Sequence, residues 1–182
     1  KIIMSNSVRV RFAPSPTGHL HIGGVRTALF NYLFAKHNNG TFLLRIEDTD
    51  TSRSTEDSIQ QIIEGLKWIG LEWDEGPFRQ TERKEIYQFY LEKLLKEGKV
   101  YKCYCSPEDL RETREKAIAA GENPRYNRNC RDLTDHPKDK PFVVRFRTPL
   151  DGSVTINDLI HGKVTFTMSE MDDIIIARSD GS

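Results

Sequence analysis

The feature that most constrains this chain is a loop rich in proline and glycine that joins a strand pattern to a helix pattern. Residues 11–24 read Arg-Phe-Ala-Pro-Ser-Pro-Thr-Gly-His-Leu-His-Ile-Gly-Gly, and residues 8–12 alternate apolar side chains with arginine. Such alternation is typical of a half-buried strand. Pro14 and Pro16 each fix φ and favour an extended residue before them, so the loop holds one path. The pattern predicts a strand, a stiff loop and a helix.

The glycines and histidines of this loop favour anion binding. Gly18, Gly23 and Gly24 leave the backbone open where the chain turns into the helix. The first turn of a helix presents unpaired N–H groups and a partial positive charge. His19 and His21 add two donors beside it. We interpret the loop as a phosphate pocket; the alternative is a stiffened turn whose histidines are incidental.

The first half of the chain alternates strand and helix patterns, which predicts a parallel sheet and an α/β fold. Ligands bind at the carboxyl ends of strands in such a sheet, where Arg11 and the acidic residues Glu47, Asp48 and Asp50 would lie. We therefore expect the loop and these acids to share a pocket. The predicted elements are a strand ending at Phe12, a helix ending at Asn38, a strand over Thr41–Glu47, a helix from a capping box at Ser54 and Asp57 to Gly70, and a helix over Thr81–Glu97.

The pattern changes from Lys99 onward to shorter elements of a smaller α+β unit. Ser106-Pro107-Glu108-Asp109 predicts the cap of a short helix that ends near Gly121. The predicted strands are Val100–Cys105, Phe142–Arg147, Ser153–Ile156, Lys163–Thr167 and Asp173–Ala177.

Composition indicates a globular chain of one domain or one and a half smaller ones. The chain has 182 residues, 37% of them apolar, and no apolar run long enough to span a bilayer. We see no leader peptide and expect a cytoplasmic location. Three cysteines, an odd number, argue against a disulfide scaffold and suit a reducing compartment.

Charge is balanced overall but clustered locally. The 27 basic and 27 acidic residues cancel, so contact with nucleic acid depends on local clusters. Residues 125–147 hold seven basic and three acidic side chains, with Tyr126 among them. This excess suits single-stranded RNA ends; the alternative is a solvated charged surface.

Several motifs together resemble one known family. His21-Ile22-Gly23-Gly24 looks like the nucleotide-binding signature of class I aminoacyl-tRNA synthetases, with Gly24 where many members carry a second histidine. The wider context is similar to bacterial-type glutamyl-tRNA synthetases. The segments that carry this resemblance are residues 11–24, Phe42–Asp50, Gly70–Pro77, Tyr104–Glu108 and Arg178–Gly181.

The resemblance implies fold, reaction and partners. Residues 1–98 would form the first half of a Rossmann-type class I synthetase catalytic fold. Residues 99–182 would form a small α+β insertion that holds the tRNA acceptor end. The implied reaction joins L-glutamate to ATP, with magnesium, as an acyl-adenylate and then transfers glutamate to the terminal adenosine of tRNA(Glu). We expect a monomer.

The resemblance also implies site residues. His21 and His19 would steady the triphosphate as catalytic residues, and Arg11 would hold the substrate carboxylate in a bidentate grip. Glu47 would pair with the substrate amino group; its alternative role is a capping or surface carboxylate. The remaining expected ATP-binding residues are Thr17, Gly18, Gly23 and Gly24, and the remaining glutamate-binding residues are Ala13 and Ser15.

Cys103, Cys105 and Cys130 are candidate zinc ligands, because residues two apart on a strand face the same side. In zinc-bearing members of the family a histidine lies two positions beyond the third cysteine, where this chain has Asp132. A carboxylate can complete a tetrahedral site, and His136 is another candidate. Buried structural thiols are the alternative.

The family also has a second half of the nucleotide-binding fold, with a Lys-Met-Ser-Lys-Ser-like loop, and an anticodon-binding region. We find neither in these 182 residues, so we expect an N-terminal fragment that is inactive alone. Two alternatives remain: a glutamyl-queuosine tRNA(Asp) synthetase, and a tRNA-binding module without catalysis.

Overall fold

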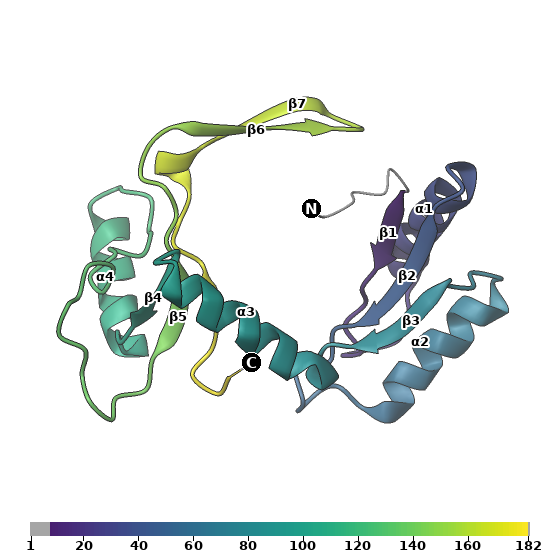
Figure 1. Cartoon of the computed structure of the whole chain (residues 1–182), viewed down its shortest axis with the longest axis horizontal. Coiled ribbons are helices and arrows are strands. Elements are labelled where there is room, and N and C mark those ends of the chain that lie inside the picture. The colour runs from purple at the N-terminus through teal and green to yellow at the C-terminus, as the bar shows by residue number, and fades with distance from the viewer. Residues whose placement is uncertain (1–7, 182) are drawn as a thin grey trace. The chain divides into compact units, whose positions relative to one another are not determined.

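The computed structural model describes residues 8–181 and divides into two compact units, with the boundary between Ile86 and Tyr87 (Figure 1). The domain boundary expected at residues 98 and 99 stays a prediction. Of the helices within residues 8–181, none has the length and apolar character needed to cross a membrane.

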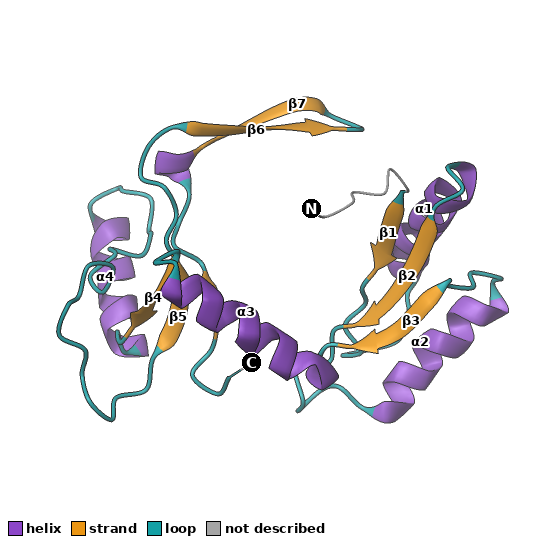
Figure 2. Ribbon diagram, viewed as in Figure 1, coloured by secondary structure: helices purple, strands orange, loops and turns teal. Residues whose placement is uncertain are grey.

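The first unit is a parallel three-stranded sheet with two helices, in the order strand, helix, strand, helix, strand (Figure 2). The strand order β1-β2-β3 confirms the predicted parallel α/β arrangement. The elements are β1 Arg9–Phe12, α1 Ile22–His37, β2 Thr41–Ile46, α2 Glu56–Trp68 and β3 Glu75–Arg79.

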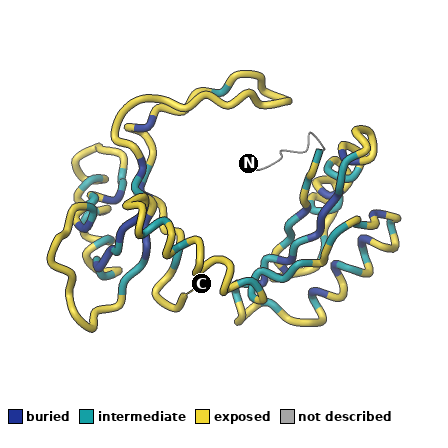
Figure 3. Tube along the Cα trace, in the orientation of Figure 1, coloured by how far each residue is buried: buried dark blue, intermediate teal, exposed yellow. Residues whose placement is uncertain are grey.

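The core of the first unit forms around β2, the central strand. Phe42, Leu44 and Ile46 are fully buried, and Leu43 between them is nearly so. A central strand of a parallel sheet is covered on both faces, so its sequence is largely apolar, here with Arg45 as a half-buried exception. Figure 3 shows buried residues along this strand. The cover comes from α1 and α2 through Ala28, Ala35, Ile59, Ile62 and Leu66.

The turn between α1 and β2 requires glycine at position 40. A Cβ at Gly40 would lie 2.3 Å from the carbonyl oxygen of Val8. Thr41 N–H donates to that same oxygen at 2.8 Å, which starts the pairing of β1 with β2. The Asn-Asn-Gly stop therefore also sets how closely the two strands approach.

Two predictions in the first unit were wrong in detail. The N-cap of α2 is Thr55, whose Oγ1 accepts the Ser58 N–H at 3.1 Å, and not Ser54. The helix predicted from Thr81 begins with a 3-10 turn, η1 Thr81–Arg83, before α3 Lys84–Lys96. We did not predict β3, because glycine and proline inside it disrupt the apolar pattern of a strand.

The second unit is the α+β unit that the sequence predicts. An antiparallel sheet has the order β4-β5-β8, and the capping box of Ser106 and Asp109 starts α4 as expected. A separate hairpin, β6 with β7, is exposed along most of its length (Figure 3). The elements are β4 Val100–Cys103, α4 Pro107–Ala119, β5 Val143–Phe146, β6 Ser153–Asp158, β7 Gly162–Thr167, the 3-10 turn η2 Met168–Glu170 and β8 Ile175–Ala177.

Candidate functional site

The loop between β1 and α1 lies beside the end of β2. Glu47 N–H donates to the carbonyl oxygen of Pro14 at 2.9 Å, which ties the loop to the residue after β2. Phe12 and Pro16 are buried and anchor the loop on the core. The loop and the first acid of the cluster therefore adjoin at the carboxyl ends of the strands, but none of the three acids lines the open pocket between this loop and α2, so the shared pocket that we expected is not formed by these acids.

An open pocket of about 310 Å³ lies between this loop and α2. Ile62 supplies the α2 wall and Phe12 the sheet wall. Six of the expected site residues line it: Ser15, Thr17, Gly18, His19, His21 and Gly24. Among the described residues, Arg11, Ala13, Gly23 and Glu47 lie outside this lining.

His21 is the N-cap of α1, a role that we did not predict. Its backbone is extended, with φ −107° and ψ 166°, and its Nδ1 accepts the Gly23 N–H at 3.1 Å. A Cβ on Gly23 would lie 3.0 Å from two atoms of the His21 ring. Gly23 therefore leaves room for the ring over the helix start. Because Nδ1 accepts the Gly23 N–H, Nε2 is the nitrogen that carries the proton in the neutral imidazole.

The acidic cluster after β2 divides into three different roles. Asp48 is buried and accepts from Thr81 N–H at 3.0 Å and from its hydroxyl at 2.7 Å, so it anchors the start of η1. Asp50 accepts from the hydroxyl of Ser52 at 2.7 Å and from Arg53, and these bonds hold its pKa below the ordinary value. Of these three acids, Glu47 therefore remains the candidate for binding a substrate.

The side chains of Glu47 and Arg11 differ in whether they form an ion pair within the first unit. Oε1 of Glu47 forms an ion pair with Arg45. Arg11 is exposed near the end of β1, and its guanidinium makes no hydrogen bond or ion pair within residues 8–181. The first unit thus presents an unpaired guanidinium and a half-engaged carboxylate at the carboxyl ends of adjacent strands.

The three cysteines meet in the second unit. The sulfur atoms of Cys103, Cys105 and Cys130 lie within 4.8 Å of one another, and none is in a disulfide. The strand expected over Val100–Cys105 ends at Cys103, so Cys105 lies in the loop two residues beyond β4 and not on the strand as predicted. Cys130 comes from the loop that precedes β5. Tyr104 N–H donates to the Cys130 sulfur at 3.4 Å. This geometry fits three ligands of one zinc ion.

Tyr126, and not Asp132, brings a fourth donor to the cysteines. The Tyr126 hydroxyl is buried, 3.2 Å from the Cys103 sulfur and 3.7 Å from the Cys105 sulfur. Asp132 has an 83% exposed side chain and pairs with Arg147 at 2.7 Å, outside the cluster. His136 packs its ring against Tyr104. The sequence offered no signal for Tyr126 beyond its position four residues before Cys130.

The thiols of the cluster have unequal proton affinities. Burial raises the pKa of Cys105 to about 12. Burial acts on Cys103 as well, but hydrogen bonds from Tyr126 and the backbone, and the charge of Arg145, hold its pKa below the ordinary value. The Arg145 guanidinium lies 3.8 Å from the Tyr126 ring centre. The charge of Arg145 thus favours the thiolate form of Cys103, which is the form that binds a metal ion.

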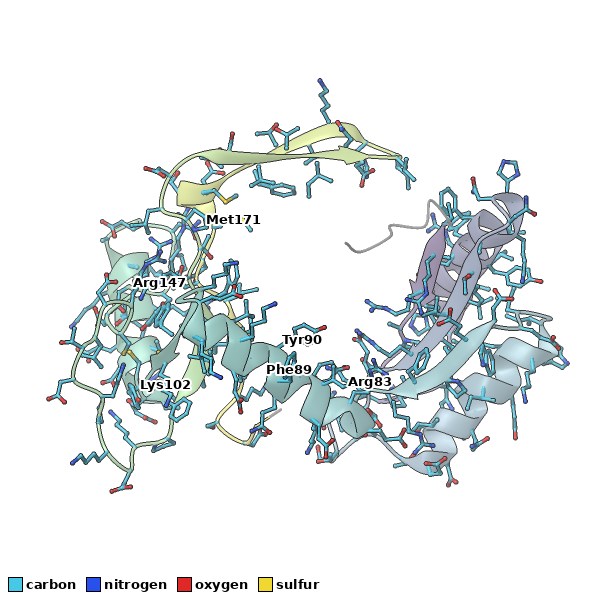
Figure 4. All side chains as sticks on the ribbon, viewed as in Figure 1. Arg83, Phe89, Tyr90, Lys102, Arg147 and Met171 are labelled. Atoms are coloured by element: carbon cyan, nitrogen blue, oxygen red, sulfur yellow. The ribbon has the colours of Figure 1, made fainter. Side chains whose placement is uncertain are left out.

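Most of the basic side chains in residues 125–147 are engaged within the second unit. Asp173 is fully buried and binds Arg131 at 2.8 Å, Arg128 at 3.5 Å and the Tyr101 hydroxyl at 2.7 Å. Arg145 donates to the Asp173 carbonyl oxygen, and Arg147, labelled in Figure 4, pairs with Asp132. These arginines therefore support the fold, and the exposed Lys138 and Lys140 remain for a partner.

Comparison with known proteins defines the class first. Residues 7–182 match the family described as tRNA synthetases class I (E and Q), catalytic domain, so the chain belongs to that family. The family resemblance and the class I α/β fold expected from the sequence are confirmed.

The particular relatives are glutamate–tRNA ligases. The chain is 62% identical to that of Thermodesulfovibrio yellowstonii, covering 96% of this chain and 37% of the relative. It is 57% identical to that of Pelobacter propionicus, covering 97% and 38%. The crystal structure of glutamate–tRNA synthetase from Elizabethkingia anophelis has a TM-score of 0.85 at 43% identity, covering 96% and 40%. The chain spans less than two fifths of the curated relatives' length, and these names do not favour the two alternative functions.

Proposed function

We propose that the full-length protein is a glutamate–tRNA ligase, which activates L-glutamate with ATP and transfers it to the terminal adenosine of tRNA(Glu). The single observation that carries this proposal is the pocket in which five expected ATP-binding or catalytic residues converge at the start of α1: Thr17, Gly18, His19, His21 and Gly24. The names of the relatives support the same reaction. Arg11 and Glu47, close by at the strand ends, suit an acidic amino acid.

In the first step, an oxygen of the glutamate α-carboxylate attacks the α-phosphorus of ATP. The bond to the bridging oxygen breaks, and pyrophosphate leaves with the electron pair. His21 donates from Nε2 to the departing phosphates, because its Nδ1 accepts the Gly23 N–H. His19 and the N-terminus of α1 stabilise the same growing negative charge, and a magnesium ion bound with ATP would supply further positive charge there.

Glutamate is selected by charge at its two ends. Arg11 holds the side-chain carboxylate with its planar fork of donors. Only Oε1 of Glu47 meets Arg45 in residues 8–181, so Oε2 can accept from the substrate ammonium. Of the other two expected glutamate-binding residues, Ser15 lines the pocket, and Ala13 lies in the same loop outside the lining.

In the second step, a ribose hydroxyl of the terminal adenosine attacks the glutamyl carbonyl carbon, and AMP leaves. Residues 99–182, which make up most of the second unit, are proposed to be the insertion that binds the acceptor end of the tRNA. A monomer in the cytoplasm remains part of the proposal, and the unpaired cysteines suit that reducing compartment.

A zinc ion in the second unit is also proposed, held by Cys103, Cys105, Cys130 and Tyr126. The sulfur separations and the buried phenol oxygen support a four-coordinate structural site. Zinc would join the end of β4 to the loop before β5 and would take no part in the reaction.

Pyrophosphate exchange with the full-length protein tests the proposed function. We expect exchange of pyrophosphate into ATP only with L-glutamate and tRNA(Glu) together, and glutamylation of that tRNA afterwards. Residues 1–182 alone are expected to be inactive. Glutamylation of tRNA(Asp) instead would favour the queuosine alternative, and tRNA binding without exchange would favour the non-catalytic module.

A further inference from the structure

The two histidines of the pocket are held by different helices. The ring Nδ1 of His19 is hydrogen-bonded to Oε1 of Gln61, which lies on α2. His21 is held by the start of α1, through Gly23 N–H. The residue between them, Leu20, is half-buried and packs against the core of the first unit.

The partners of the two rings require opposite tautomers. An amide oxygen only accepts, so Nδ1 of His19 must carry a proton to bond Gln61. A backbone N–H only donates, so Nδ1 of His21 must be bare. In the neutral ring, the nitrogen left for a ligand is therefore an acceptor in His19 and a donor in His21.

We propose that Gln61 is a positioning residue that sets the ring orientation and tautomer of His19, so that His19 donates to a phosphate only as an imidazolium. This inference rests on the proposed function. Gln61 accepts from Nδ1–H whether or not Nε2 carries a proton, so it holds the ring in both forms. His21 needs no second proton. The pair thus provides one neutral donor and one cation to the same triphosphate.

The packing of Leu20 independently shows that α2 supports this segment. A Cβ on Gly65 would lie 3.1 Å from Leu20 Cδ2, and a Cβ on Gly24 would lie 3.2 Å from Cδ1. Leu20 therefore fills a space between α1 and α2 that glycine leaves on both helices. Gln61 and Gly65 are four residues apart and share one face of α2, so one helix face contacts two successive loop residues.

Variants of Gln61 in the full-length protein separate positioning from folding. Gln61→Leu removes the acceptor, and we expect KM for ATP in pyrophosphate exchange to rise about tenfold, as for loss of one hydrogen bond at a charged site. Gln61→Glu keeps an acceptor for Nδ1–H of His19, so KM for ATP should stay close to the wild-type value. Gln60→Leu is the matched control, because Gln60 lies next in sequence and bonds Glu56 instead.

Nitrogen NMR of 15N-histidine-labelled protein reports the tautomers directly, with assignment from His19→Gln and His21→Gln. We expect protonated Nδ1 in neutral His19 and protonated Nε2 in neutral His21, and loss of the His19 preference in Gln61→Leu alone. A wild-type His19 protonated on Nε2, or unchanged KM in Gln61→Leu, would overturn the inference. A protein without exchange but with the expected tautomers would instead contradict the proposed function.

Discussion

The hydroxyl oxygen of Tyr126 lies 3.2 Å from the sulfur of Cys103, within a cluster otherwise made of cysteines. The same oxygen accepts the backbone N–H of Cys130 at 3.2 Å, which fixes the ring in place. The phenol oxygen is therefore placed beside the three sulfur atoms as the candidate fourth ligand of the proposed zinc ion, whereas Asp132 lies outside the cluster.

The zinc content of variants at Tyr126 and Asp132 tests which of these two residues is the fourth ligand. We expect Tyr126→Phe to weaken zinc binding at least about tenfold, because it removes a donor from the site. Asp132→Ala should keep zinc, since its carboxylate is exposed and paired with Arg147. Metal analysis after dialysis against chelators of increasing affinity measures the zinc that each variant retains. Loss of zinc in Asp132→Ala with retention in Tyr126→Phe would reverse the assignment.

Arg11→Lys tests the grip on glutamate. We expect kcat/KM for glutamate to fall about a hundredfold, because lysine cannot form the bidentate contact. The melting temperature should not change, since Arg11 is exposed and has no partner within residues 8–181. Arg9→Lys is the matched control: Arg9 lies on the same strand and pairs with Glu75. Equal activity of the two variants would exclude Arg11 as the glutamate ligand.

Substitution of His21 separates capping from catalysis. His21→Asn keeps an N-cap acceptor, so we expect thermal stability to be retained while pyrophosphate exchange is lost. His21→Ala should also destabilise the first unit by about 1 kcal/mol, because the Gly23 N–H loses its acceptor. Thermal unfolding and exchange assays on the same preparations give both quantities. An active His21→Asn protein would mean that the imidazole serves only the helix.

Asp173 is expected to control the stability of the second unit. Burial disfavours its charge, but Tyr101, Arg131 and Arg128 more than compensate and lower its pKa. Asp173→Asn should destabilise the unit by about 3 kcal/mol at neutral pH, since it leaves the partly buried Arg131 and Arg128 without their counter-charge. Asp135→Asn, at an exposed position, should change stability little.

The pH dependence of this effect has a definite sign. Because folding lowers the Asp173 pKa, the stabilisation is complete above the unfolded value near 3.8 and is lost as pH falls through the lower folded value. The difference in melting temperature between the wild type and Asp173→Asn should therefore narrow only below about pH 4. A difference that is constant down to acid pH would show that the carboxylate charge does not contribute.

Local sequence patterns predicted those elements whose signals lie within a few residues. The capping box of Ser106 and Asp109 bonds neighbours three positions apart, so it can be read directly. The largely apolar sequence of Thr41–Glu47 likewise predicts a strand, and the structure places that strand at the centre of the sheet. Prediction failed for β3, whose Gly76 and Pro77 lack a strand pattern; its pairing with β2 stabilises it instead.

The sequence by itself determined the family and the first four elements of the first unit, from β1 to α2, because these depend on local spacing and on motifs. Only the tertiary structure decided which side chains are already engaged. It paired Asp48 with Thr81, Glu47 with Arg45, His19 with Gln61 and most arginines of residues 125–147 with buried acceptors. Several of these contacts join residues more than thirty positions apart, so local sequence patterns do not reveal them. These contacts decide which donors and acceptors of a side chain remain free to bind a ligand.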